Sequence, residues 1–315
     1  MGITYSILTE IFPPKSQFDP ERDIPDLSDQ VMIVTGGYTG IGYHTVKALL
    51  VKGAKVYIAG RNKDKGEKAI AQLKQETNGK EALFLELDLA NLKSVQNAAA
   101  EFVRREGRLH VLFNNGGVST PPVSDVTSDG YDLQFGTNVV GHFYFTKLLL
   151  PILLATAKTT TSGKVRVVST SSMAHLMGDL DFATFRDGPA RKKKSTLMLY
   201  AQSKFGNVVL SNQLAKRYGD QGIVSTSLHP GILRTELGRH LSTIEQLLLS
   251  TMCYDPPYGA LTQLWAGATD EGLKYNGMYL IPWAREGRPN PRTNDEKTGD
   301  ELWTWLEEQV KDIAS

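Results

Sequence analysis

Tyr200 and Lys204 are separated by three residues, in the stretch Tyr-Ala-Gln-Ser-Lys. In a helix, residues four apart share one face, so this phenol and this ammonium group would point the same way. A phenol has a pKa of about 10 and transfers protons poorly at neutral pH, but a fixed cation beside it would lower that pKa. The pair could therefore serve proton transfer. The same spacing also arises by chance on solvated helix faces.

A second stretch, residues 31–46, could bind a phosphate. Its first four residues are apolar and predict a short buried strand, and glycines 36, 40 and 42 then lead into a helical pattern. Such a turn directs backbone N–H groups and the positive end of a helix dipole at one point, without Cβ atoms in the way. The spacing is G-x-x-x-G-x-G, and a tight turn without a ligand is the alternative interpretation.

The end of the next predicted strand bears on the choice of dinucleotide. In NAD-binding proteins an acidic residue about 20 positions past the glycines holds the adenosine ribose. Here Gly60, Arg61 and Asn62 occupy this place, and a guanidinium can pair with a 2′-phosphate. The sequence therefore favours NADP(H) over NAD, with a surface arginine as the alternative. Asp88, after the third predicted strand, suits the adenine edge or could cap the helix that begins near Asn91.

Short apolar stretches alternate with helical patterns along the chain. This alternation predicts right-handed crossovers and an α/β fold, a Rossmann-type doubly wound parallel sheet of about seven strands in a single domain. The predicted strands are 31–34, 55–59, 82–87, 109–113, 164–169, 223–228 and 278–281, and the main predicted helices are 63–75, 92–105, 130–154, 199–218, 257–268 and 302–310.

Four prolines predict an extended arm over residues 1–30, and residues 31–315 are expected to form one NADP(H)-binding catalytic domain. Within this domain, the polar segment 176–199 is an insertion loop. Its basic run 191–194 is interpreted as a solvated tip, with contact to phosphate or to an anionic membrane surface as the alternative. Residues 232–256 are apolar enough for a lid over a hydrophobic substrate, or for two helices packed on the core. The segments 119–123 and 173–177 are expected to complete the substrate wall.

Composition and charge exclude several classes of protein. The net charge of +1 gives no reason to expect a nucleic-acid partner, and the single cysteine, Cys253, fits a reducing compartment and a cytoplasmic location. No secretory signal is recognised, and no membrane span is predicted. Gly2 followed by Ser6 loosely matches the N-myristoylation pattern, so acylation stays open.

Three histidines invite a metal hypothesis, but no metal site is predicted. His142, His175 and His229 lack the spacing of metal ligands, and no cysteine or carboxylate cluster accompanies them. His142 and His229 are expected to be packed or hydrogen-bonded structural residues. His175 could line the pocket just past Ser172.

The order and spacing of these motifs resemble the short-chain dehydrogenase/reductase superfamily. The phrases at 135–143, 171–175 and 200–204 look like its retinol-dehydrogenase-like and fungal reductase branch. Gly116 departs from the alanine usual in that loop, and Thr39 stands where some NADP-preferring members have a basic residue. The matching residues are Thr35-Gly36, Gly40-Ile41-Gly42, Asn114-Asn115-Gly116-Gly117, Asn138, Ser172, Tyr200, Lys204, and Pro230-Gly231 followed by Thr235.

The resemblance implies a role for each matching side chain. Tyr200 is the general acid in reduction and the base in oxidation, and Ser172 orients the substrate oxygen, with Ser171 as the competing choice. Lys204 lowers the tyrosine pKa and binds the nicotinamide ribose, and Asn138 holds a water of a proton relay. The expected cofactor-binding residues are Thr35, Gly36, Tyr38, Thr39, Gly40, Ile41, Gly42, Arg61, Asp88, Leu89, Asn115, Gly116, Gly117, Tyr200, Lys204, Pro230, Gly231 and Thr235.

The resemblance further implies an NADP(H)-dependent oxidoreductase of the EC 1.1.1 type that interconverts a small hydrophobic carbonyl and its alcohol. A ketoreductase of fungal secondary metabolism and an enzyme of lipid alcohols both fit. The alternative is a catalytically silent nucleotide sensor or scaffold of the same fold. A homodimer through the helices of Asn138 and Tyr200 is also expected, with the alternative that the proline arm or the insertion 176–199 blocks it.

Overall fold

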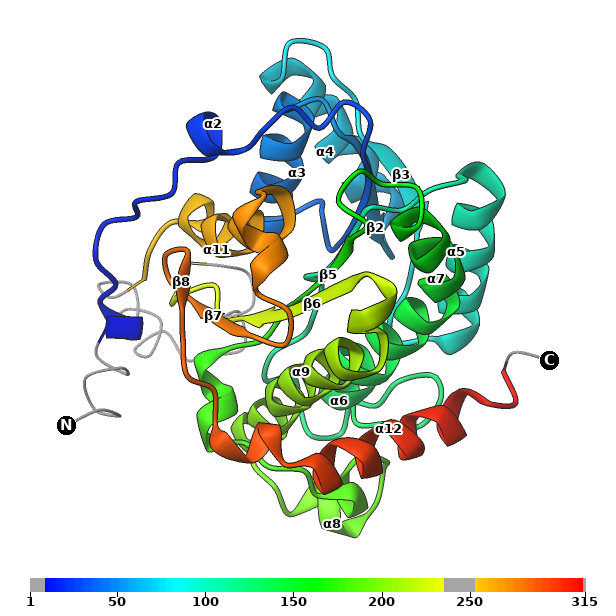
Figure 1. Cartoon of the computed structure of the whole chain (residues 1–315). Coiled ribbons are helices and arrows are strands. Elements are labelled where there is room, and N and C mark those ends of the chain that lie inside the picture. Colours follow the sequence, from blue (N-terminus) through cyan, green and yellow to red (C-terminus); the bar gives the residue numbers. More distant parts are fainter. Residues whose placement is uncertain (1–8, 235–252, 314–315) are drawn as a thin grey trace.

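The computed structural model describes residues 9–234 and 253–313, and one sheet runs through the molecule (Figure 1). Its strand order is β3-β2-β1-β4-β5-β6-β7-β8, parallel from β3 to β7 and antiparallel at β8. The doubly wound fold is thus confirmed, with one strand more than the seven expected, because the two-residue β8 has no apolar pattern to predict it. The strands are β1 Val31–Thr35, β2 Lys55–Gly60, β3 Leu83–Glu86, β4 Val111–Asn114, β5 Val165–Thr170, β6 Ile223–Leu228, β7 Tyr279–Ile281 and β8 Arg285–Glu286.

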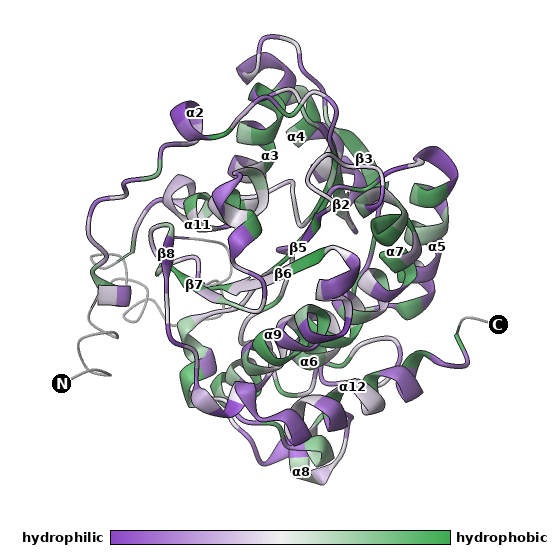
Figure 2. Cartoon of the chain, in the orientation of Figure 1, coloured by the Kyte–Doolittle hydropathy of each residue, from purple (hydrophilic) through white to green (hydrophobic). Residues whose placement is uncertain are grey.

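Helices cover both faces of this sheet, and each face has its own hydrophobic core. Alternate residues of β1 separate the two: Val31 and Ile33 join one cluster, and Met32 and Val34 join the other. The first cluster lies under α5 (Leu92–Arg105), α7 (His142–Ala157), α9 (Thr196–Tyr218) and α12 (Glu296–Val310), and the second under α3 (Gly40–Val51), α4 (Lys63–Glu76) and α11 (Pro256–Ala268). Hydrophobic colour accordingly follows the strands and the helices beside them (Figure 2).

Polar side chains fix where several helices begin. Asn62 caps α4 by accepting a hydrogen bond from the Lys65 N–H, and Asn91 caps α5 by accepting from the N–H of Lys93 and of Ser94. The alternative role of Asp88 as the cap of α5 was therefore wrong. Its carboxylate instead accepts the N–H of Ala90, within the loop that follows β3.

The long apolar helix predicted over 130–154 is three connected pieces. They are α6 (Leu133–Phe135), the π-helix η1 (Gly136–Gly141) and α7, which continues through Pro151 to Ala157. Residues 133–157 are long and apolar enough to cross a membrane, with a mean hydropathy of 1.5. However, 67% of that window is buried inside the protein, so this is the core helix of the fold.

The insertion 176–199 is folded, and its basic run is only in part a solvated tip. Arg191 is fully buried, and its guanidinium contacts the carboxylate of Asp132 at 3.2 Å and that of Asp187 at 2.7 Å. The prediction of a solvated tip was wrong for Arg191. A run of four cations is usually solvated, but here the carboxylates of Asp132 and Asp187 neutralise the Arg191 guanidinium. The short helices here are η2 (Met173–Met177), η3 (Phe182–Thr184) and α8 (Pro189–Lys192).

The described part of the arm lies along the domain, as Figure 1 shows. Phe18, Ile24 and Leu27 are buried in the same cluster as α3 and α11, which anchors the arm on that face of the sheet. The arm also contains α2 (Pro20–Asp23), and the remaining short helices are η4 (Gly219–Gln221), η6 (Glu271–Lys274) and η7 (Pro291–Asn294).

Candidate active site

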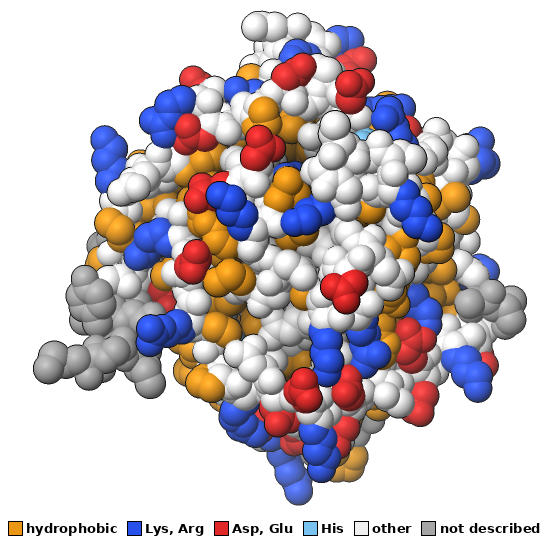
Figure 3. All heavy atoms as spheres, viewed as in Figure 1, with side chains coloured by type: hydrophobic (Ala, Val, Ile, Leu, Met, Phe, Trp, Pro, Cys, Tyr) orange, Lys and Arg blue, Asp and Glu red, His pale blue; other side chains and the backbone are white. Residues whose placement is uncertain are grey.

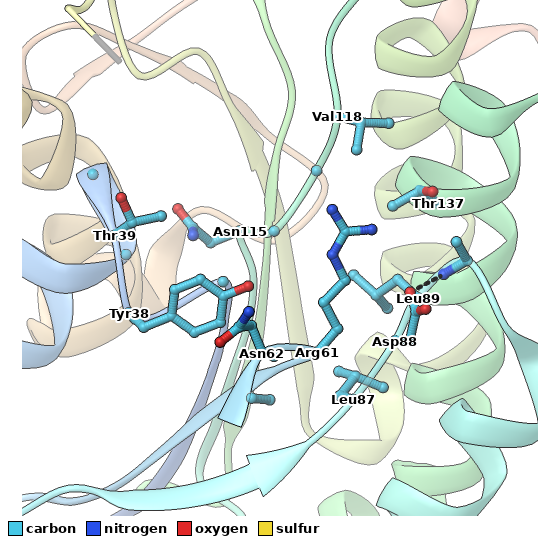
Figure 4. A pocket seen from close by; sticks show the side chains of 18 of the residues that line it. Tyr38, Thr39, Arg61, Asn62, Leu87, Asp88, Leu89, Asn115, Val118 and Thr137 are labelled. Atoms are coloured by element: carbon cyan, nitrogen blue, oxygen red, sulfur yellow. Dashed lines mark hydrogen bonds between the residues drawn. The ribbon is translucent and has the colours of Figure 1, made fainter. Parts of the chain in front are cut away.

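A groove of about 280 Å³ opens along the carboxyl ends of β1, β2 and β4 (Figure 4). This is the place where parallel sheets bind dinucleotides. Its lining contains Gly36, Tyr38, Thr39, Gly40, Ile41, Gly42, Arg61, Asp88, Leu89, Asn115, Gly116 and Gly117 of the expected set, together with Ala59, Gly60, Asn62, Lys65, Leu87, Ala90, Val118, Leu133 and Thr137.

The glycine turn between β1 and α3 needs its glycines. Gly36 and Gly40 have φ angles of +65° and +53°, which favour glycine. A β-carbon at Gly42 would collide with the carbonyl oxygen of Gly36. The turn therefore presents bare backbone to the groove, as a pyrophosphate requires.

Thr35 supports this turn from below and does not line the groove. Its hydroxyl oxygen accepts the N–H of Asn115 at 2.9 Å and that of Gly116 at 2.8 Å. The amide group of Asn115 in turn donates to the Thr35 carbonyl at 2.8 Å. Thr35 thus joins the loop after β1 to the loop after β4, so its contribution to cofactor binding is indirect.

At the other end of the groove, the side chain of Arg61 extends between Tyr38 and Asp88 (Figure 4). Lys65, one turn into α4, lines the same region and adds a second cation that the sequence analysis missed. Its signal was the four-residue spacing from Arg61, which places both near the start of one helix. A region with two cations suits a phosphate group.

Ser172, Tyr200 and Lys204 meet at the end of β5. Lys204 is buried, its Nζ donates to the Thr170 carbonyl at 2.9 Å, and it lies 5.8 Å from the centre of the Tyr200 ring. Burial lowers the pKa of Lys204 to about 8. Burial also raises the pKa of Tyr200, and the side chains of Ser172 and Ser119, both within hydrogen-bonding reach of the phenol, oppose that rise. Burial thus outweighs the effect of the two serines on the Tyr200 pKa, and the lowering expected from the lysine stays a prediction.

The two adjacent serines face different ways. Ser171 is buried and donates to the carbonyl oxygen of Lys204 at 2.7 Å, which fixes the strand against α9. Ser172 is the serine beside the phenol. His175 does not line the pocket: it is fully buried, with Nδ1 2.7 Å from the Ser172 carbonyl and Nε2 accepting the Asn290 N–H.

Asn138 joins the groove to this group of side chains. Its amide exchanges two hydrogen bonds with the backbone of Val118 and donates to Ser203 Oγ at 3.0 Å. A β-carbon at Gly117 would lie 2.8 Å from Asn138 Oδ1 and 3.7 Å from Lys204 Nζ, so the groove ends next to the lysine. The water relay expected of Asn138 stays a prediction.

Some expected cofactor-binding residues, Tyr200 and Lys204 among them, do not line the groove. Pro230 is buried and Gly231, with a φ of +96°, packs near Trp283 at the end of β6, outside the lining of the groove. Thr235 and most of the expected lid 232–256 lie outside the described residues. Ser119 was expected only as substrate wall, and nothing in its sequence position indicated a contact with Tyr200. Over residues 9–234 and 253–313, no three His, Cys, Asp or Glu side chains form a metal-binding group.

Comparisons with known proteins agree with this geometry. Residues 30–185 match the short chain dehydrogenase family model. A short-chain dehydrogenase/reductase of Armillaria gallica is 54% identical over 312 residues, covering 99% of this chain and 100% of the relative. Human retinol dehydrogenase 12 is 38% identical over 280 residues, covering 88% and 85% of the two chains.

Among solved structures, a Mycobacterium paratuberculosis protein has a TM-score of 0.74 at 26% identity and covers 94% of this chain and 98% of its own. RhlG of Pseudomonas aeruginosa, solved as an NADP active-site complex, has a TM-score of 0.63 at 25% identity, with 82% and 95% covered. The chain therefore belongs to the short-chain dehydrogenase/reductase superfamily, in its retinol-dehydrogenase-like and fungal reductase branch.

Proposed function

We propose that this oxidoreductase uses NADP(H) to interconvert a hydrophobic carbonyl compound and its alcohol. The observation that carries the proposal is the meeting of Ser172, Tyr200 and Lys204 next to Gly117, a residue of the groove that Arg61 also lines. The glycine turn supports a dinucleotide, because its positive φ angles and close backbone packing require glycines, and the resulting bare backbone lines the groove where a pyrophosphate would bind.

Each side chain then has a defined task. When bound, the nicotinamide supplies or accepts the hydride. In reduction, Tyr200 gives its phenol proton to the carbonyl oxygen, while the Ser172 hydroxyl donates a hydrogen bond to that oxygen. Lys204 holds its ammonium beside the phenol ring, and its proposed further task is to bind the nicotinamide ribose. Oxidation runs through the same contacts in reverse.

The preference for the phosphorylated dinucleotide rests on Arg61 and Lys65, which offer two cations where NAD-specific proteins have a carboxylate. The NADP bound to RhlG supports this choice by similarity. For the substrate, the exposed side chains of Met177, on η2 close after Ser172, and of Leu197, three residues before Tyr200 in α9, support an apolar molecule. The names of the relatives, reductases of fungi and a retinol dehydrogenase, point the same way.

The test is a screen of aliphatic and aromatic ketones and aldehydes with the purified full chain, followed by NADPH absorbance. We expect turnover of an apolar carbonyl and a loss of at least about 10²-fold in kcat on Tyr200→Phe, since general acid catalysis contributes that much. Turnover unaffected by Tyr200→Phe would overturn the proposal. Tight NADPH binding without turnover of any compound would favour the alternative, a nucleotide sensor.

Two further properties belong to this proposal. A cytoplasmic location is proposed from the single cysteine. The face in Figure 3 mixes basic and acidic side chains, which supports neither a nucleic-acid partner nor an anionic membrane surface there.

A further inference from the structure

Ser119 stands between two residues whose backbones are held by buried amide side chains. The N–H of Val118 donates to Asn138 Oδ1 at 2.9 Å, and its carbonyl accepts from Asn138 Nδ2 at 3.0 Å. On the other side, the N–H of Thr120 donates to Gln134 Oε1 at 2.9 Å. Both amides are buried, so water does not compete for these bonds.

The loop is held in a conformation that it would not adopt alone. Thr120 has a φ of +48°, a region that costs a non-glycine residue free energy and persists only where the surroundings impose it. Here Gln134 imposes it, and the same amide donates through Nε2 to the Thr196 carbonyl at 2.9 Å. Thr196 is the first residue of α9, one turn before Tyr200. Gln134 therefore ties the loop of Ser119 to the helix of Tyr200.

The loop held by Asn138 and Gln134 brings the hydroxyl group of Ser119 to Tyr200. Ser119 approaches the phenol from the end of β4, and Ser172 approaches it from the end of β5. We propose that Ser119 is a further catalytic residue, whose hydroxyl holds the Tyr200 oxygen so that Ser172 is free to bind the substrate oxygen, with Gln134 as its positioning residue. This inference rests on the proposed function, because it gives Ser119 a task only if Tyr200 transfers the proton.

The role of the Ser119 hydroxyl follows from the proton transfer by Tyr200. When the Tyr200 O–H bond breaks and the proton goes to the substrate oxygen, a phenolate remains. The Ser119 hydroxyl donates a hydrogen bond to this anion, and hydrogen bonds to charged groups are stronger than those to neutral ones. The charged group beside the ring is Lys204, 5.8 Å from the ring centre. Ser119 adds a directional hydrogen bond at the phenol oxygen itself.

The direct test is the titration of Tyr200 in the full chain, labelled with ¹³C at tyrosine Cζ and saturated with NADP⁺. Tyr200→Phe identifies the resonance. We expect Ser119→Ala to move its titration to higher pH, and Ser119→Thr, which keeps the hydroxyl, to restore the original value. Ser124→Ala, an exposed serine of the same loop, is the matched control and should change nothing. A Tyr200 titration unchanged in Ser119→Ala overturns the inference.

Turnover and the positioning residue give two independent readouts. Ser119→Ala should lower kcat about tenfold with little change in the Kd of NADPH, as expected for a lost hydrogen bond to a charged group. Gln134→Met should shift the Tyr200 titration in the same direction, and its effect should vanish in the Ser119→Ala background. If the Gln134 effect persists there, Gln134 does not act through Ser119. Turnover that survives Tyr200→Phe would instead overturn the proposed function.

Discussion

The ring of Tyr38 lies against Gly60 at the end of the groove that Arg61 lines. A β-carbon at residue 60 would be 2.9 Å from Tyr38 Cδ1 and 3.2 Å from its Cζ, and closer still to Cε1. The residue that ends β2 is therefore bare because Tyr38 fills the space of its side chain. Because Gly60 has no side chain, the next residue along the chain, Arg61, supplies the side chain that extends into the groove after β2.

Gly60→Ala should displace the Tyr38 ring and disturb the groove for both dinucleotides. Since overpacking costs about 1–3 kcal/mol, we expect the Kd values of NADPH and NADH each to rise roughly tenfold in a fluorescence titration. Gly107→Ala is the control, because a β-carbon there meets open space. If Gly60→Ala bound NADPH and NADH as tightly as the wild type, the Tyr38 ring would be shown to move away without any loss of dinucleotide affinity.

Arg61→Ala should separate the two cofactors. A lost charge-assisted bond to the 2′-phosphate costs about 1.5–3 kcal/mol, so the Kd of NADPH should rise by about 10- to 150-fold while that of NADH changes little. Lys65→Ala should act in the same direction. The result that contradicts the NADP(H) assignment is tighter binding of NADH than NADPH that Arg61→Ala leaves unaffected.

Stability should fall as the pH drops below the usual pKa of histidine. Burial lowers the pKa of His142 and of His175 to about 4 and that of His229 to about 3, and His44 and His110 shift in the same direction. Between pH 6.5 and 4 the unfolded chain therefore binds more protons than the folded one, and folding loses free energy as the pH falls.

The fully buried histidines should each contribute about 2 kcal/mol of this loss between pH 7 and pH 5. Urea unfolding at pH 7, 6 and 5 measures it, and most carboxylates titrate below this window, at about pH 4. An unfolding free energy that stays constant from pH 7 to pH 5 would contradict the neutral, buried state of these rings.

The sequence alone predicts the sheet and most of the groove, because strand-end glycines and apolar strands follow local rules. It does not predict contacts that depend on long-range packing. Arg191 looks like part of a solvated run until Asp132, 59 residues away, pairs with it. By sequence, Ser119 is predicted only to line the substrate pocket. Its position beside α9 depends on Gln134, which bonds both the loop and the start of that helix. By sequence, the helix cap is an alternative role for Asp88, because Asp and Asn are both good caps, and only the backbone geometry selects Asn91.

Arg191→Met should destabilise the fold strongly. Removing one partner of a buried ion pair leaves a charge without compensation and costs about 3–5 kcal/mol. Here the carboxylate left behind is Asp132, which also caps α6 by accepting the N–H groups of Gln134 and Phe135. Lys193→Met, an exposed cation of the same run, is the control and should change stability by less than about 0.5 kcal/mol. Equal urea midpoints for the two variants would contradict this account.

Helix α12 covers the helices through which the sequence predicts a homodimer. Trp303 meets Phe143 of α7 edge to face with ring centres 5.2 Å apart, and the Arg217 guanidinium of α9 lies 4.7 Å from its ring. Arg217 also pairs with Asp300 at 2.7 Å. Figure 1 shows α12 running alongside α9. The part of α9 that lies under α12 is thus occupied by the chain itself, and the homodimer stays a prediction.

From this cover we expect a monomer, and sedimentation velocity at micromolar concentration decides between it and the predicted dimer. Trp303→Ala should cost about 3–5 kcal/mol of stability, since it empties the space between α7 and α9, whereas Thr304→Ala on the exposed side of α12 should be close to neutral. A dimer that persists in wild type and is disrupted by substitutions on α7 or α9 would show that these helices associate despite α12. A dimer insensitive to them would place the interface elsewhere and leave the role of α12 intact.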